Sequence, residues 1–119
     1  MGLDQWAGYY TEDKDEEGDA IMEYAAEWRK HPNLQGFMEN LYREKGGTET
    51  FNTPAKVELV LGDIDALEEA VKNASLPETG GFFFGSDTDE EYEEQDLQFC
   101  EYARQCLNEG KRIYYSSWW

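Results

Sequence analysis

Residues 81–96 read GFFFGSDTDEEYEEQD, and this stretch joins the most apolar run of the chain to its most acidic run. The three consecutive phenylalanines at 82–84 are typical of a short strand that is buried on both faces and therefore central in a sheet. The acidic run that follows contains Thr88 and Glu91, which have the spacing of a helix capping box. The pattern predicts that a core strand ends just before a long, negatively charged helix over about 88–109. The acids of this run are Asp87, Asp89, Glu90, Glu91, Glu93, Glu94 and Asp96.

The segments on either side of this stretch alternate between helix and strand patterns. Pro32 opens a helix with apolar residues at helical spacing, and Gly46 and Gly47 end it. A strand is predicted over 56–61, followed by a helix that starts at Gly62-Asp63 and ends at Asn73. The last strand is predicted over 111–118. The apolar positions that carry the helix predictions are Leu34, Phe37, Met38, Leu41 and Tyr42, then Ile64, Leu67, Ala70 and Val71, then Phe99, Cys100, Ala103, Cys106 and Leu107.

The stretch over 20–29 fits two patterns. Ile21, Tyr24 and Trp28 fall at helical spacing, whereas Met22, Tyr24 and Trp28 also fit the alternation of a strand. Its two alanines favour a helix, and its Tyr and Trp favour a strand, and the pattern alone slightly favours a helix. Residues 3–11 are aromatic-rich and fit a strand, and a charged turn follows them at 12–19.

These elements define a single α+β domain over residues 1–119. With 20–29 taken as a strand, the order is β-β-α-β-α-β-α-β. It predicts a mixed sheet of four to five strands with about three helices on one face. A chain of 119 residues is long enough to bury a core without disulfides, and its 15% aromatic residues supply much of the buried area.

The formal net charge of −17 excludes some partners and favours others. It disfavours direct binding to nucleic acid or to anionic membranes, and it favours salt-sensitive association with basic surfaces. It is also the charge of a protein that is acidic only for solubility. The basic residues Arg29, Lys30, Arg43 and Lys45 flank the first long helix, where they would neutralise nearby acids or hold an anion. No signal peptide or long apolar run is present, and the two free thiols, Cys100 and Cys106, suggest a reducing cytosolic setting.

Several segments together carry a resemblance to known proteins. They are the MGLD start, WRKHPNLQGFMENLYREKGG, FN before a strand and helix, the GGFFFG run, and the closing YYSSWW. Over nearly the whole chain the sequence resembles a family of small bacteriophage and prophage proteins without an agreed activity. The resemblance implies a phage source and an extended stretch before WRK, so it favours a hairpin of 3–11 with 20–29. A Cys often follows FN in that family, whereas Thr53 stands there in this chain.

The sequence predicts no catalytic, cofactor or metal site. Asp13, Asp15 and Glu17 have the early spacing of a calcium loop, but Tyr24 stands where the bidentate Glu is required. Asp87, Asp89 and Glu91 lack a His nearby or a fixed geometry. His31 is the only histidine, and its position before Pro32 suits an N-cap or first-turn role. No nucleotide-binding loop or nucleophile motif is present, and we expect the protein not to be an enzyme.

The leading hypothesis is a phage-encoded inhibitor that mimics nucleic acid. Its outward carboxylates would occupy the DNA- or RNA-binding surface of a basic host protein of defence or transcription in the host cytoplasm, as an anti-CRISPR or anti-restriction protein does. A first alternative is a module that docks through exposed aromatics, Trp118 and Trp119, with acidity serving solubility. A weaker alternative is a protein that binds a divalent metal. The predicted partner-binding acids are Asp87, Asp89, Glu90, Glu91, Glu93 and Glu94, supported by Asp13, Asp15, Glu16 and Glu17.

Overall fold

The computed structural model describes residues 3–14, 16–18, 20–29, 31–52, 55–76 and 89–118. Within these ranges the side chains of residues 12, 13, 20 and 89–91 are outside the description. The predicted strand at 82–84 and the predicted cap Thr88 also lie outside the described residues.

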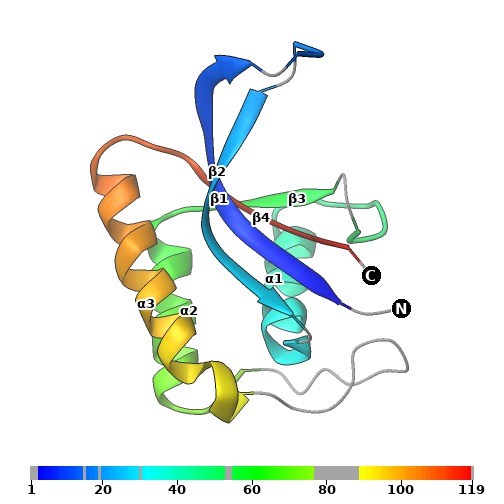
Figure 1. The fold of residues 1–119 in the computed structure, drawn as a ribbon. Coiled ribbons are helices and arrows are strands. Elements are labelled where there is room, and N and C mark those ends of the chain that lie inside the picture. The colour runs from blue at the N-terminus through cyan, green and yellow to red at the C-terminus, as the bar shows by residue number, and fades with distance from the viewer. Residues whose placement is uncertain are drawn as a thin grey trace.

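The described strands form one four-stranded sheet in the order β2-β1-β4-β3 (Figure 1). Its strands are β1 (Asp4–Lys14), β2 (Ala20–Arg29), β3 (Lys56–Leu59) and β4 (Ile113–Trp118). All three described pairings are antiparallel, so the sheet of the described strands is antiparallel where a mixed one was predicted. The reason is the place of β4, which returns between β1 and β3 and runs opposite to both. The α+β class itself is confirmed.

The N-terminal hairpin is confirmed, and a β-bulge explains why the pattern over 20–29 was ambiguous. Ala7 pairs with Ala26, but its neighbour Gly8 pairs with Tyr24, so Ala25 is an extra residue in β2. A bulge shifts the alternation of inward and outward side chains along the strand. Gly8 is required at this point, because a Cβ there would lie 2.0 Å from the carbonyl oxygen of Glu23.

The three helices are α1 (Pro32–Glu44), α2 (Leu61–Lys72) and α3 (Asp89–Asn108), close to their predicted bounds. The strand predicted over 56–61 ends earlier, at Leu59, because Val60 already caps α2. The Val60 amide donates to Asp63 Oδ2 at 2.9 Å, which starts the helix one residue before the predicted Gly62.

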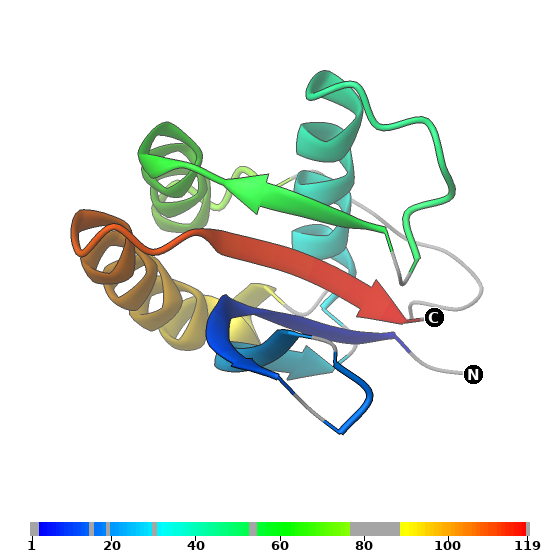
Figure 2. The same ribbon diagram turned by 90° about the horizontal axis from the view of Figure 1, so that it is seen from above.

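All three helices lie on one side of the sheet, and the core fills the space between them (Figure 2). Trp28 of β2 packs edge-on against Phe99 of α3, with ring centroids 5.2 Å apart. The predicted inward positions of α2 and α3 are buried, except that Ala70 and Leu107 are partly buried. The fully buried side chains of the core include Leu34, Met38, Phe51, Leu59, Ile64, Leu67, Phe99, Ile113 and Tyr115.

The hairpin extends beyond the rest of the sheet. Strand β4 pairs with β1 only along residues 4–8, whereas β1 continues to Lys14 and pairs there with Ala20 of β2. The outer part of the hairpin therefore projects from the sheet as a two-stranded arm (Figure 1). We call residues 9–24 the hairpin arm.

Candidate functional site

The acidic run of the sequence divides on α3 into exposed and buried positions. Glu93 and Glu94 are exposed, and Glu101, two helical turns beyond Glu94, is exposed on the same stripe. Asp96 is fully buried. The backbones of residues 89–91 lie in α3, while the side chains of Asp89, Glu90 and Glu91 are outside the description and Asp87 lies outside the described residues.

The supporting acids of the hairpin lie far from those of α3. Glu16 and Glu17 are exposed at the tip of the hairpin arm, and the Asp13 backbone lies in β1. Asp15 lies outside the described residues. In Figure 1 the tip of the arm and the first turns of α3 are at opposite ends of the molecule. The structure therefore separates the two predicted groups of acids into two surfaces.

Nearly all basic side chains contact acids or aromatic rings of this chain. Of the ten Lys and Arg residues, eight make such contacts, Lys14 is exposed without one among the described residues, and Lys30 lies outside them. Arg104 of α3 donates to both Asp65 and Glu68 of α2 and so joins the two helices. Arg112 binds Glu58 through two hydrogen bonds of 2.8 Å, which lowers the pKa of the Glu58 carboxyl. The other pairs are Arg29–Asp4, Arg43–Glu39, Lys45–Asp63, Lys72–Glu68 and Lys111–Glu109, and Lys56 lies over the rings of Tyr10 and Tyr114.

The basic residues around α1 do not form an anion site among the described residues. Arg29 lies at the end of β2 and pairs with Asp4, whereas Arg43 pairs with Glu39 within α1. Lys45 donates to Asp63 Oδ2 at 2.6 Å. Of the two uses that the sequence allowed, neutralisation of nearby acids is the one the structure supports.

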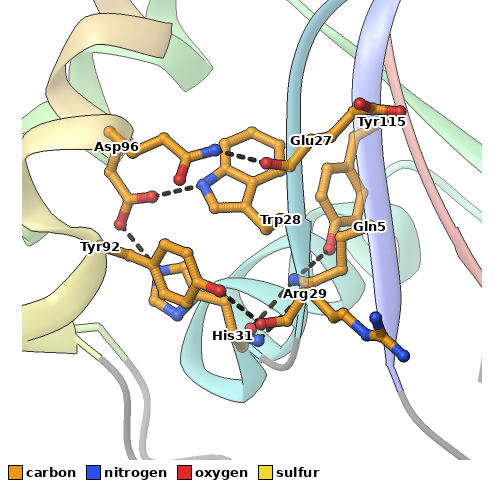
Figure 3. Close-up of polar contacts among 9 residues, drawn as sticks. Gln5, Glu27, Trp28, Arg29, His31, Tyr92, Asp96 and Tyr115 are labelled. Atoms are coloured by element: carbon orange, nitrogen blue, oxygen red, sulfur yellow. Dashed lines mark hydrogen bonds and ion pairs between the residues drawn. The ribbon is translucent and has the colours of Figure 1, made fainter.

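Asp96 is the centre of a buried polar junction between α3, β2 and the start of α1 (Figure 3). Its Oδ1 accepts a hydrogen bond from Trp28 Nε1, and its Oδ2 lies 2.8 Å from His31 Nε2. Asp96 and His31 are each fully buried. These two contacts, one to each carboxylate oxygen, offset the free-energy cost of removing the carboxylate from water. We call Asp96, Trp28 and His31 the buried junction.

A second set of buried hydrogen bonds continues from this junction to the sheet. The Gln5 side chain accepts from the His31 amide and donates to the His31 carbonyl and to the Tyr115 hydroxyl. Tyr115 then donates to Gln35 of α1 at 2.7 Å, and Gln35 donates to Ser117 of β4 at 2.9 Å. Burial raises the pKa of Tyr115 far above its ordinary value, so its hydroxyl stays protonated. Buried polar groups that are paired in this way fix the position of α1 on the sheet.

Side chains of the described residues surround the buried junction. The ring of Tyr92 stacks on His31 at 4.8 Å, and its hydroxyl donates to the Arg29 carbonyl. A hollow of about 420 Å³ lies beside the junction, but neither His31 nor Asp96 lines it. His31 occupies the N-cap position of α1, as predicted, but its side chain makes no capping hydrogen bond and its ring binds Asp96 in the core.

Both cysteines are buried on α3. Cys100 and Cys106 are buried free thiols, and burial is the main reason that the pKa of Cys100 is raised to about 12. A thiol with such a pKa is unreactive at neutral pH. No group of three His, Cys, Asp or Glu residues within the described ranges is placed to hold a metal ion. In the same part of the chain, no helix has the length and apolar character that a bilayer crossing needs.

The sheet face opposite the helices carries exposed aromatic side chains. Trp118 is 61% exposed at the end of β4, which is where the aromatic alternative placed a contact, and Trp119 lies outside the described residues. By register, Trp6 and Tyr114 lie on the same face, because Asp4 opposes Trp118 and Gly8 opposes Tyr114. This face of the sheet has no helix over it among the described elements (Figure 2).

Comparisons with family models, curated proteins and solved structures find no match for this chain.

Proposed function

We propose that this protein is a phage-encoded acidic inhibitor that occupies the nucleic-acid-binding surface of a basic host protein. The observation that carries the proposal is the way the cations are used. Eight of the ten basic side chains are engaged by acids or rings of the chain itself. Glu93, Glu94 and Glu101 of α3 are exposed, and within the described ranges no Lys or Arg pairs with them.

The geometry of α3 suits this role. Carboxylates one and two turns apart on a helix are spaced by about 5–11 Å and are held by a rigid element. Arg104 and the packing of Phe99 fix the helix against α2 and the sheet. A basic groove built for the phosphates of a duplex would meet a fixed row of negative charge at low cost in conformational entropy. The predicted mechanism is competitive, stoichiometric and weakened by salt.

The test uses a pair of variants with equal changes in charge. Glu93→Gln/Glu94→Gln removes two charges from α3, and Glu44→Gln/Glu49→Gln removes two exposed charges from the last residue of α1 and the loop that follows it. Wild-type protein is used to capture partners from host lysate at low and at high salt. We expect a basic partner that salt releases and that loses its binding to duplex DNA when one equivalent of the protein is added.

The α3 variant should bind that partner about fivefold more weakly at low salt, and the control variant should bind it like wild type. A partner that stays bound at high salt, or equal loss of affinity in both variants, would contradict mimicry by α3.

A second candidate function is docking through the aromatic face of the sheet. It is favoured by the 61% exposure of Trp118, because a large apolar ring left in water costs free energy that a partner can recover. Trp118→Ser should then abolish binding to the captured partner while Glu93→Gln/Glu94→Gln has no effect. The opposite result favours the acidic helix.

A further inference from the structure

The outer edge of β2 is covered along only half of its length. Strand β2 is an edge strand, and among the described strands it pairs with β1 alone. Near its C-terminal end, α3 covers this edge: Gln95 Nε2 donates to the Glu27 carbonyl, and the Tyr92 hydroxyl donates to the Arg29 carbonyl (Figure 3). These two contacts satisfy backbone groups that would otherwise be open to another strand.

No such cover is present along residues 20–25, within the part of the chain that the structure describes. There β2 belongs to the hairpin arm, which projects away from the helices (Figure 1). The side chains on this part of the strand are exposed to an unusual degree for apolar residues: Ile21 is 39% exposed and Tyr24 is 57% exposed. An open edge flanked by exposed apolar side chains is the surface to which an extended peptide adds as a further strand.

The charges around the arm indicate which peptide would bind there. Residues 9–24 contain seven acidic residues and one Lys, and Glu16, Glu17 and Glu23 are exposed among those described. The opposite edge of the arm, that of β1, has a different environment. Lys111 lies over the Tyr9 ring and Lys56 over the Tyr10 ring, so that edge is flanked by positive charge.

We infer that the β2 edge over residues 20–25 is a docking site for an extended, Lys- or Arg-bearing segment of a partner protein. The segment would add as a strand beside β2. Tyr24 and Glu23 are consecutive in a regularly paired part of β2 and so lie on opposite faces. The apolar side chains of the segment would lie next to Tyr24 on one face, and its cations next to Glu23 on the other. A second copy of this chain fits poorly, because it would bring a second Glu23 and a second set of arm acids to the same edge. The inference does not depend on the proposed role of the α3 acids.

The experiment uses three short synthetic peptides with blocked ends. The first alternates valine and lysine, the second has glutamate in place of lysine, and the third is the first with N-methylated backbone amides, which cannot donate hydrogen bonds. Binding is followed by the amide NMR shifts of the wild-type protein. We expect the first peptide to shift and protect the amides of residues 20–25 and to bind at least tenfold more tightly than the other two.

Variants of the protein test whether the peptide binds next to Glu23. Glu23→Lys should lower the affinity for the first peptide by about fivefold, and the matched exposed change Glu69→Lys on α2 should leave that affinity unchanged. Glu93→Gln/Glu94→Gln should also leave it unchanged, so failure of this inference and failure of the proposed function are distinguishable.

Three outcomes would overturn the inference. Equal binding of the N-methylated peptide would show attraction by charge alone. Shifts confined to α3 or to the aromatic face of the sheet would place the peptide elsewhere. A protein that sediments as a dimer, with the amides of residues 20–25 already protected, would assign the edge to a second copy.

Discussion

Asp96 and its neighbours Glu93 and Glu94 lie within four residues on one helix, yet they have opposite environments. Asp96 faces the sheet, where Trp28 and His31 bind both of its oxygens. Glu93 and Glu94 face solvent, and no Lys or Arg of the described residues contacts them. The three carboxylates have the same charge and nearly the same sequence context. For Glu94 the difference follows from the helical repeat, which places it about 160° around the helix from Asp96. Glu93 is only about 60° from Asp96, at the edge of the buried face, and its side chain is exposed.

The comparison separates two uses of negative charge. A buried carboxylate stabilises a fold only through its specific partners, because loss of those partners leaves an uncompensated charge or polar group in the core. An exposed carboxylate is hydrated and contributes little to stability, so it is available to a basic partner. Acids on the outer face of α3 can therefore change without loss of the fold, whereas Asp96 cannot.

The largest expected effect is that of Asp96→Ala. The substitution leaves Trp28 Nε1 and His31 Nε2 without their acceptor in the core, so we expect the free energy of unfolding to fall by about 3–5 kcal/mol. Urea denaturation followed by Trp fluorescence measures this change. Glu94→Ala, on the exposed face of the same helix, is the control. A loss below about 1 kcal/mol for Asp96→Ala would mean that water replaces the missing carboxylate.

An intermediate effect on the free energy of unfolding is expected from ionisation of the Cys100 thiol, which lies on the buried face of α3. Its pKa is about 12 in the folded protein and near 9 in the unfolded chain, so the folded state holds the thiol proton more tightly. The stabilisation is complete below about pH 9 and is lost as pH rises toward 12, because the unfolded chain ionises first.

Between pH 8 and pH 10 the contribution of this one group should fall by about 1.4 kcal/mol. The measurement compares the pH dependence of urea unfolding for wild type and Cys100→Ala. The variant should be less stable at pH 8 because of its cavity, but its stability should fall less steeply up to pH 10. Parallel curves would show that the thiol is not buried in solution.

The smallest effect is expected from Glu93→Gln/Glu94→Gln. Because both side chains are hydrated, the free energy of unfolding should change by less than about 0.5 kcal/mol, with a slight gain from reduced charge repulsion. Urea denaturation at low salt is the appropriate measurement, and Glu44→Gln/Glu49→Gln is again the matched control. A fall in the free energy of unfolding of more than about 1 kcal/mol would contradict the conclusion that Glu93 and Glu94 contribute little to stability.

The elements of the fold were predictable because their signals are local. Pro32 and Gly46 mark the ends of α1, and the spacing of Ile64, Leu67 and Val71 identifies α2 and its buried face. The order of the strands in the sheet was harder to predict from the sequence. The place of β4 between β1 and β3 depends on pairings between segments more than 50 residues apart, for which the sequence contains no local signal.

The buried junction was missed for the same reason. His31 and Asp96 are separated by 65 residues, and each had an ordinary local explanation: a helix start for His31, and membership of a solvated acidic run for Asp96. The one available signal was the helical repeat of α3, which places Asp96 one turn before the buried Phe99 and Cys100.

The sequence by itself determined the α+β class, the three helices and the net negative charge, since these follow from periodicity, turn residues and composition. The pattern over 20–29 left helix and strand open, so the N-terminal hairpin did not follow from it. Only the tertiary structure decided which carboxylates are buried, which cations are already paired, and which part of the β2 edge is open. The physical reason is that these properties depend on contacts between residues far apart in the chain, and packing alone brings those residues together.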